Sequence, residues 1–556
     1  MTADHSGEEQ VTRAAGVVGG ATFLSRLLGY ARDAVVAALF GATASADAFF
    51  VAFRIPNLLR RMFAEGSLSV AFIPVFSETL HTKGRAEALR LAQATLLILV
   101  ILLAGLVLLG IFLAPSIVTV VGPGFKDDPA LFTLTVELTR IMFPYIFFIG
   151  LVALSMGILN VFGHFAAPAL APVVLNLAII GAALVVSPHL EQPVTGLALG
   201  VLAGGAGQLA LQVPFLYRYG VRLGWPAAFH HAGLKKIGRL MLPAAFGAAV
   251  YQINVLINTQ LATLLPRGSV SYLYYADRLV QFPLGIVGIA AATALLPSLS
   301  RQALTGDRAG VNRTFTHAVN VVLFITIPAM CGLIMLREPI IWLLFKRGAF
   351  DLEAVRLTAV ALLYYTAGLW AFTLARLATQ TFYALQDTRT PVWTAAVSIG
   401  VNIACGLILM RFMGHAGLAL ATTIASGVNV ILLFAALRLK LGGLGMTAIV
   451  QSAGKALFCA LVMCAGLFFI RPGIPGGWFH FGPGHRVGAR PFHPGRYQPL
   501  FNRRASGALF RVDGADRWDP LPPTTLTIDC MPVEKLLIRT HLKKVFWPKL
   551  GVGRSE

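Results

Sequence analysis

Apolar stretches of about twenty residues recur along most of this 556-residue chain. A helix of that length crosses the hydrocarbon core of a bilayer, where every backbone polar group must be satisfied within the segment. The sequence therefore predicts an all-α polytopic membrane protein. We expect thirteen spans, near residues 14–40, 47–77, 89–114, 131–160, 167–187, 194–217, 237–265, 269–299, 316–336, 355–385, 391–412, 416–438 and 450–470.

The composition supports membrane lipids, and not nucleic acid, as the surroundings of the chain. Only 12% of the residues are charged and 57% are hydrophobic, whereas soluble domains contain about 25% charged residues. The formal net charge of +21 would suggest nucleic-acid binding in a soluble protein. Here the basic residues gather in short loops between apolar spans, so we expect no nucleic-acid partner.

The distribution of charge between alternate loops predicts the orientation of the chain. Basic residues are concentrated in loops 81–90, 218–236 and 301–313, whereas loops 41–46 and 187–193 are neutral or acidic. Cytoplasmic loops of membrane proteins carry an excess of Lys and Arg. We therefore expect a multi-pass protein of the bacterial cytoplasmic (inner) membrane with a cytoplasmic N-terminus.

An internal repeat appears when the two halves are compared. The motif IPVFS around Pro74 matches LPSLS around Pro297, and HFAAP ending at Pro168 matches DTRTP ending at Pro391. Both pairs are displaced by 223 residues. Copies of six helices enter the membrane in the same orientation, and substrates of such parallel repeats bind between the copies. The alternative is that Pro and Gly recur wherever membrane helices kink.

The repeat predicts the domain organisation. We expect an N-terminal lobe of helices 1–6 at residues 1–228 and a C-terminal lobe of helices 7–12 at 229–448. An additional transmembrane helix is expected at 449–470. Residues 471–556 form a basic tail rich in Gly, Pro and Arg that we expect to be poorly ordered.

Ionised side chains interrupt the first two spans at helical spacing. Asp47, Arg54 and Arg61 are seven residues apart and share one helix face, with Glu65 a turn below Arg61. On the preceding span Arg26 and Asp33 repeat this spacing, and Arg32 lies about a third of a turn away. A charge at the bilayer centre costs about 2.5–3.5 kcal/mol, so such residues face a partner or a wet cavity.

The second half contributes further charges within residues 271–301. Asp277 is most simply the counter-charge of an arginine, whereas Arg278 adds to the positive side chains of the interior. Arginine outnumbers acidic residues in these spans, and its planar fork binds phosphate in a bidentate manner. This pattern favours a phosphorylated or pyrophosphorylated ligand in a cationic cavity.

Two sets of candidate residues follow. The expected substrate-binding residues are Arg26, Arg32, Arg54, Arg60, Arg61 and Arg278, and the expected charge balance comes from Asp33, Asp47, Glu65 and Asp277. Alternatively, the carboxylates neutralise the arginines completely and only lock the helices together. Helical geometry alone turns Arg60 away from the charged face, toward lipid or a loop.

Sequence patterns of catalysis and metal binding are absent. The chain has no H-E-x-x-H, G-x-S-x-G or Walker motif, and its cysteines form no C-x-x-C pair. We therefore expect a transporter without an enzymatic activity, a metal site or a cofactor.

Several motifs together resemble the MurJ (MviN) family, the lipid II flippases of the MOP exporter superfamily. They are SRLLGYARD, ADAFFVAFRIPNLLRRMFAEGSLSVAFIPVF, YYADRLVQFPLGIVGIAAATALLPSLS and FYALQDTRTP, and the resemblance covers about residues 10–470. It implies two six-helix lobes in which helices 1, 2, 7 and 8 line a central cationic cavity. It also implies translocation of undecaprenyl-pyrophosphate-linked disaccharide pentapeptide, lipid II, from the cytoplasmic to the outer leaflet by alternating access, for peptidoglycan synthesis.

The same resemblance assigns roles to individual residues. The family's essential cavity charges fall on Arg26, Arg32, Asp47, Arg60 and Arg278, with Arg54, Glu65 and Asp277 as further matching positions. For Arg60 we follow the resemblance, since a kink at Pro56 would turn the side chain inward. Family members carry two further helices that form a groove for the lipid tail, whereas only 450–470 is apolar enough here.

Two other functions stay open on the sequence alone. One is export of another lipid-linked oligosaccharide or a small molecule by a protein of the same superfamily. The other is a non-transporting scaffold for the cell-wall synthesis or division machinery, which is also an expected partner of a flippase.

Overall fold

The computed structural model describes residues 2–62, 68–221 and 231–470. Glu65, the tail 471–556 and the expected lobe boundary at 228/229 lie outside these described residues. The division into lobes at that position therefore stays a prediction.

Every regular element in the described ranges is helical, as the sequence predicts. In the first half the helices are α1 (Thr2–Phe40), α2 (Ala44–Met62), α3 (Leu68–Lys83), α4 (Arg85–Phe112), α5 (Ala114–Val121), η2 (Pro123–Asp127), α6 (Pro129–Met142), α7 (Tyr145–Val161), α8 (Ala166–Gly181), η3 (Ala182–Val186), η4 (Ser187–His189) and α9 (Val194–Arg218).

The second half follows the same order. It contains α10 (Ala232–Thr263), α11 (Ser269–Pro283), η5 (Leu284–Ile289), α12 (Ala290–Leu304), α13 (Arg308–Met335), α14 (Arg337–Phe345), α15 (Leu352–Ala367), α16 (Leu369–Ala384), α17 (Arg389–Met413), α18 (His415–Leu441) and α19 (Met446–Ile470). Each of the thirteen expected spans corresponds to one of these helices or to two or three in succession. The short helices α5 and α14 were not expected from the sequence.

Hydropathy separates the helices into two kinds. Among the described residues, eight helices are long and apolar enough to cross a membrane, or nine if α15 and α16, bent by 42°, form one span. Neither α1, α2 nor α11 is among the eight, since α1 and α2 carry ionised residues and α11 has only 15 residues. Hydropathy alone therefore does not identify the helices that carry the candidate site as spans.

The internal repeat is visible in the helix boundaries. Four helices of the second half begin 223 residues after their counterparts in the first half. The pairs of first residues are Arg85 and Arg308, Ala114 and Arg337, Pro129 and Leu352, and Ala166 and Arg389. The short helices α5 and α14 obey the same displacement, which makes them part of the repeated unit.

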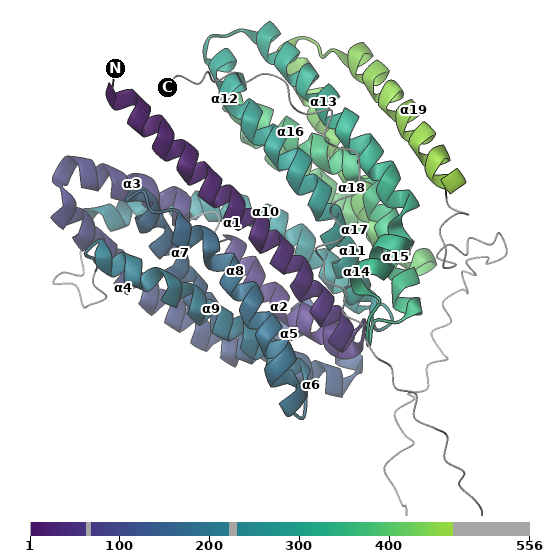
Figure 1. Ribbon diagram of the computed structural model, residues 1–556, viewed down its shortest axis with the longest axis horizontal. Helices are drawn as coiled ribbons and strands as arrows, with labels where there is room; N and C mark the ends of the chain where they lie inside the picture. The colour runs from purple at the N-terminus through teal and green to yellow at the C-terminus, as the bar shows by residue number, and fades with distance from the viewer. Residues whose placement is uncertain (1, 63–67, 222–230, 471–556) are drawn as a thin grey trace, which may run out of the picture. The chain divides into compact units, whose positions relative to one another are not determined.

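The packing of helices repeats in the same way. Helix α1 packs on α8 as α10 packs on α17, and α2 packs on α6 as α11 packs on α15. Helix α3 contacts α4 and α7, as α12 contacts α13 and α16. Figure 1 shows α19 beside α13, outside this repeated arrangement. The expected pair of parallel six-helix repeats with an additional C-terminal helix is confirmed.

Helix α10 contacts both halves. It packs on α3 of the first half and on α17 of the second. On the second side, Asn402 donates to Asn254 Oδ1 at 2.8 Å and to Asn258 Oδ1 at 2.7 Å, and Asn258 donates to Thr422 at 3.2 Å. Hydrogen bonds between membrane helices contribute about 0.6–2 kcal/mol each, so this network holds α10 to α17 and α18.

The end of the helix bundle that contains the α1–α2 turn, here called the Gly41 end, joins the two halves through close backbone contacts. The Ala349 N–H, in the loop between α14 and α15, donates to Ala38 O at 2.8 Å. In the first half, Gly124 N–H of η2 donates to Thr263 Oγ1 of α10 at 3.3 Å. In each half, the segment that follows the short helix therefore contacts the end of the first helix of the other half. The segment after α14 contacts α1, and the segment after α5 contacts α10.

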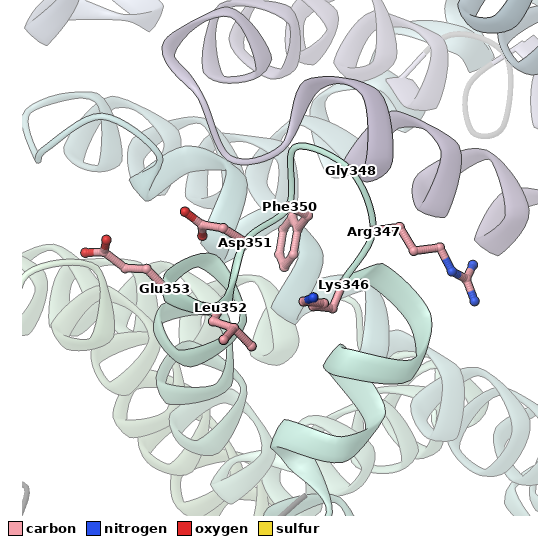
Figure 2. A pocket seen from close by; sticks show the side chains of 7 residues that line it. All are labelled: Lys346, Arg347, Gly348, Phe350, Asp351, Leu352 and Glu353. Atoms are coloured by element: carbon pink, nitrogen blue, oxygen red, sulfur yellow. The ribbon is translucent and has the colours of Figure 1, made fainter. Parts of the chain in front are cut away.

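Glycine is required in the loop between α14 and α15. Figure 2 shows Gly348 at the tip of this loop, beside the faint purple ribbon of the first half. Its φ is +52°, a conformation that L side chains rarely adopt, and a Cβ atom there would overlap Ala38 O. A surface hollow of about 430 Å³ lies beside the loop, with Lys346 and Glu353 among its lining residues. None of the candidate site residues lines this hollow.

We predict that Gly348→Ala destabilises the junction at the Gly41 end. The substitution combines backbone strain, about 1–3 kcal/mol, with the clash against Ala38. The matched control is Gly442→Ala, because Gly442 also has a positive φ, +75°, but has open space around its Cβ position. Thermal unfolding of the purified protein in detergent should show a larger loss of melting temperature for Gly348→Ala. Equal losses would show that the contact with α1 contributes nothing.

Candidate functional site

The candidate site lies where α1, α2 and α11 meet. Of the expected residues, α1 carries Arg26, Arg32 and Asp33; α2 carries Asp47, Arg54, Arg60 and Arg61; and α11 carries Asp277 and Arg278. Helix α11 packs on α2, and hydrogen bonds connect it to α1. The structure therefore brings charges from both halves together, as the sequence predicts.

Asp33 is shared by arginines from the two halves. Its Oδ1 accepts hydrogen bonds from Arg32 Nη2 at 2.6 Å and Arg32 Nε at 3.0 Å, and its Oδ2 accepts one from Arg278 Nε at 2.8 Å. Asp33 is 2% exposed, whereas the side chain of Arg278 is 32% exposed. One carboxylate therefore balances two guanidinium groups, and part of Arg278 stays accessible.

Neutral side chains fix the orientation of this ion pair. The Tyr274 hydroxyl donates to Asp33 Oδ1 at 3.2 Å and also accepts from Arg32 Nη2 at 3.2 Å. Asn176 of α8 accepts from Arg32 Nη1 at 3.2 Å and donates to Ser25 O at 3.0 Å. Arg32 is 9% exposed and all three of its nitrogens have partners, so neighbouring side chains fix the orientation of its guanidinium.

Asp277, the residue before Arg278 on α11, is negatively charged and interacts with α2. Asp277 interacts electrostatically with Arg54 and Arg61, and its carboxylate accepts a hydrogen bond from Gln281. Arg54 Nε is buried without a hydrogen-bond partner among the described residues. The two adjacent charged residues of α11 thus interact with different helices. Arg278 pairs with the carboxylate on α1, and Asp277 interacts with the arginines on α2.

Asp47 has a different role from the expected charge balance. Its carboxylate accepts from Gly268 N at 2.6 Å, Ser271 N at 2.8 Å and Ser271 Oγ at 2.6 Å. These donors form the N-terminus of α11, where unpaired N–H groups and the helix dipole favour an anion. The seven-residue spacing placed Asp47 on the face of Arg54, but the start of α11 supplies its hydrogen bonds.

Aromatic rings separate this helix cap from the charges. Phe50 of α2 stacks on Tyr274 with centroids 4.0 Å apart and contacts Tyr275 at 5.6 Å. Tyr275 also packs on Phe345 and Phe350 at the Gly41 end. Since these rings are buried or half-buried, they close the site toward the Gly41 end.

The arginines farthest from the Gly41 end are the least neutralised. Arg26 lies seven residues before Asp33 on α1, and Arg61 lies seven after Arg54 on α2. Neither forms an ion pair or hydrogen bond with another side chain in the described ranges. Arg60, which helical geometry alone turned away from the charged face, donates to Asn57 Oδ1 at 3.1 Å and is half-buried.

Arg26 reaches the second half through a glycine. A Cβ atom at Gly285 would lie 2.5 Å from Arg26 Nη1, so the guanidinium occupies space that a side chain at this position would compete for. Gly285 belongs to η5, a π-helical turn that follows Pro283, and such turns are frequent at functional sites. The site therefore changes along its length from a buried cap at Asp47, through paired charges, to Arg26, which has no carboxylate partner among the described residues.

Sequence reasoning missed the neutral members of the site. Asn176, Tyr274 and Gly285 carry no charge, so the search for ionised residues in apolar spans did not select them. An amide in the apolar run of α8 was the available signal for Asn176. Among the described residues no group of three His, Cys, Asp or Glu side chains could hold a metal ion.

Comparison with known proteins gives consistent matches. The family model described as Lipid II flippase MurJ matches residues 36–481. A probable lipid II flippase MurJ from Vibrio cholerae is 42% identical over 435 residues, which cover 76% of this chain and 82% of that protein. The lipid II flippase MurJ from Burkholderia cenocepacia is 40% identical over 433 residues, covering 77% and 83%.

Solved structures agree with these sequence matches. A lipid II flippase MurJ in an inward closed conformation superposes with a TM-score of 0.71 at 27% identity, covering 83% of this chain and 94% of that one. An inward-facing MATE multidrug transporter of the MOP superfamily gives a TM-score of 0.65 at 17% identity, covering 79% and 99%, and shows a shared fold. By its sequence and its structure, this chain belongs to the MurJ family of lipid II flippases.

Proposed function

We propose that this chain is a transporter that moves lipid II across the bacterial inner membrane by alternating access. The observation that carries the proposal is the graded arginine site between α1, α2 and α11, which suits a diphosphate. Guanidinium groups bind phosphate oxygens through two parallel hydrogen bonds, and these strengthen where water is scarce. The family membership supports lipid II as the molecule that bears this diphosphate.

The direction of loading follows from the closed Gly41 end. Asp47, the aromatic rings and the Ala38–Ala349 contact seal that end. With the proposed cytoplasmic N-terminus, the α1–α2 turn lies at the outer face of the membrane. Arg26, which has no carboxylate partner among the described residues, and Arg61 are then the first arginines that a diphosphate entering from the cytoplasmic leaflet meets.

Deeper in the site, the ligand competes with carboxylates. The diphosphate binds Arg278 and Arg54, which interact with Asp33 and Asp277 in the empty protein. These carboxylates pair with the arginines in the absence of ligand. Without them the arginines would be unpaired buried charges, which cost several kcal/mol. Opening of the outer end breaks the hydrogen bonds of Asp47, and release of the ligand restores the ion pairs.

A contact of this protein with the cell-wall synthesis or division machinery stays a prediction.

The function predicts a leaflet-specific accumulation of lipid II. Depletion of this protein in its host should leave lipid II in the inner leaflet and reduce its labelling at the outer face. Restoration by the full chain, in cells that lack their own flippase, is the matching gain-of-function test. Unchanged outer-face labelling after depletion would reject lipid II flipping, and cation-dependent drug efflux from vesicles would favour another exporter.

We predict that Arg278→Ala lowers the flipping rate about 10- to 100-fold. The substitution removes a charge-assisted contact with the diphosphate, worth about 1.5–3 kcal/mol, while Arg32 still balances Asp33. Arg278→Lys should retain part of the activity, since it keeps the charge without the fork. The control is Arg411→Ala, an exposed residue in the last turn of α17. If Arg278→Ala flips lipid II as fast as the control, Arg278 does not bind the substrate.

We predict that Asp47→Asn opens the Gly41 end. An amide cannot accept all the hydrogen bonds that the carboxylate accepts from Gly268 and Ser271, and it lacks the charge that the helix N-terminus favours. A cysteine at Ala46, which is 0% exposed, should then react faster with a membrane-impermeant maleimide in a background without native cysteines. The control is Asp307→Asn, which removes the capping carboxylate of α13, away from the Gly41 end. The same labelling rate in both variants would refute the role of Asp47.

A further inference from the structure

An open surface cavity of about 320 Å³, with polar residues in its lining, lies against α13, far in sequence from the arginine site. Its lining residues are Asn312, Arg313, Thr316, His317 and Asn320 of α13 and Gly445, which precedes α19. The α13 residues are four apart in two rows, so they form one stripe on the helix. The stripe runs about 12 Å along α13, from near the N-terminus of the helix into its apolar part.

The stripe is not explained by packing within the protein. Thr316 donates to Asn312 Oδ1 at 3.2 Å, which leaves the Asn312 amide N–H groups available. Asn320 Oδ1 is buried and has no hydrogen-bond partner among the described residues. Gly445 forms a wall of the cavity, because a Cβ atom there would lie 2.9 Å from Thr316 Cγ2.

The charge of the cavity is basic. The Arg313 side chain is 75% exposed, and its nearest carboxylate, Asp307, lies 4.0 Å away and also caps α13 through Gly310 N. His317 adds an N–H donor in either tautomer. On the neighbouring α18, Lys440 is already paired with Asp387. Arg313 is therefore the cation that remains available to an anion in this cavity.

An apolar surface continues from the polar stripe. Along α13, Asn320 is followed by Val321, Phe324 and Ile325, which are 43%, 63% and 45% exposed. Helix α19 packs against α13 and exposes Phe458 and Leu461. Polar lining residues followed within one turn by exposed apolar side chains match the amphiphilic pattern of a phospholipid.

We propose that this cavity binds the headgroup of an anionic glycerophospholipid. Arg313 and His317 bind the phosphodiester, and the amides of Asn312 and Asn320 hydrogen-bond the hydroxyl groups of a glycerol headgroup. The acyl chains lie along the exposed residues of α13 and α19. Basic pockets between membrane helices on the cytoplasmic side recognise such lipids, and loop 301–313 lies on that side in the proposed orientation. The lipid would attach α19, which lies outside the repeat, to the second half.

The test measures lipid binding to the purified full chain in detergent. Native mass spectrometry and thermal unfolding are recorded with phosphatidylglycerol, phosphatidylethanolamine and phosphatidylcholine of the same acyl chains, and with inorganic phosphate. We expect phosphatidylglycerol to bind and to raise the melting temperature. Arg313→Gln should weaken this binding at least about tenfold, since a charge-assisted hydrogen bond is lost.

Two further variants make the test specific. Asn320→Leu should reduce the preference for phosphatidylglycerol over phosphatidylethanolamine. Arg411→Gln changes a residue in the last turn of α17 that does not line the cavity, and this variant should bind like the wild type. Equal phosphatidylglycerol binding by Arg313→Gln and Arg411→Gln would overturn the proposal. So would equal stabilisation by inorganic phosphate, which would indicate an anion site without lipid recognition. Native mass spectrometry and thermal unfolding both measure lipid binding directly, so their outcome does not depend on lipid II flipping, for which the proposed residues lie outside this cavity.

Discussion

The sharing of Asp33 between Arg32 and Arg278 is the interaction on which the site depends. Ions are costly inside a membrane protein, and a carboxylate held between guanidinium groups from α1 and α11 offsets that cost while joining the two halves. The pairing is incomplete by charge, because one carboxylate faces two cations. The remaining positive charge is what the proposed anionic ligand would neutralise, and so the same contact would serve both stability and the proposed binding.

Sequence periodicity predicted which side chains would meet, but not their individual partners. The seven-residue spacing of Arg54 and Arg61 placed both near Asp277, because spacing determines the face of a helix. Asp47 shares that face and yet binds the N-terminus of α11. The position of that terminus depends on the glycine turn at Gly268 and on packing between the halves, and neither is encoded in the pattern of α2.

The fold was more predictable than the site because apolar length and the 223-residue displacement are properties of the chain itself. The displacement gave the repeat, and hydropathy gave the thirteen spans. The short helices α5 and α14 are too short to be recognised by either signal. Their function becomes clear only in three dimensions, where the loop after each one packs on the first helix of the opposite half.

The repeat also explains where the charges lie. With the displacement of 223 residues, Asp277 corresponds to Arg54, and these two residues interact with each other. A contact between equivalent positions lies close to the axis that relates them, as in a symmetric dimer. The same displacement relates Arg32 and Asp33 to Val255 and Leu256 of α10, which carry no charge. The repeat therefore supplies the scaffold, and its departure from symmetry supplies the charges of the candidate site: Arg32 and Asp33 of α1 have apolar counterparts on α10, so these charges lie on one side of the junction of α1, α2 and α11.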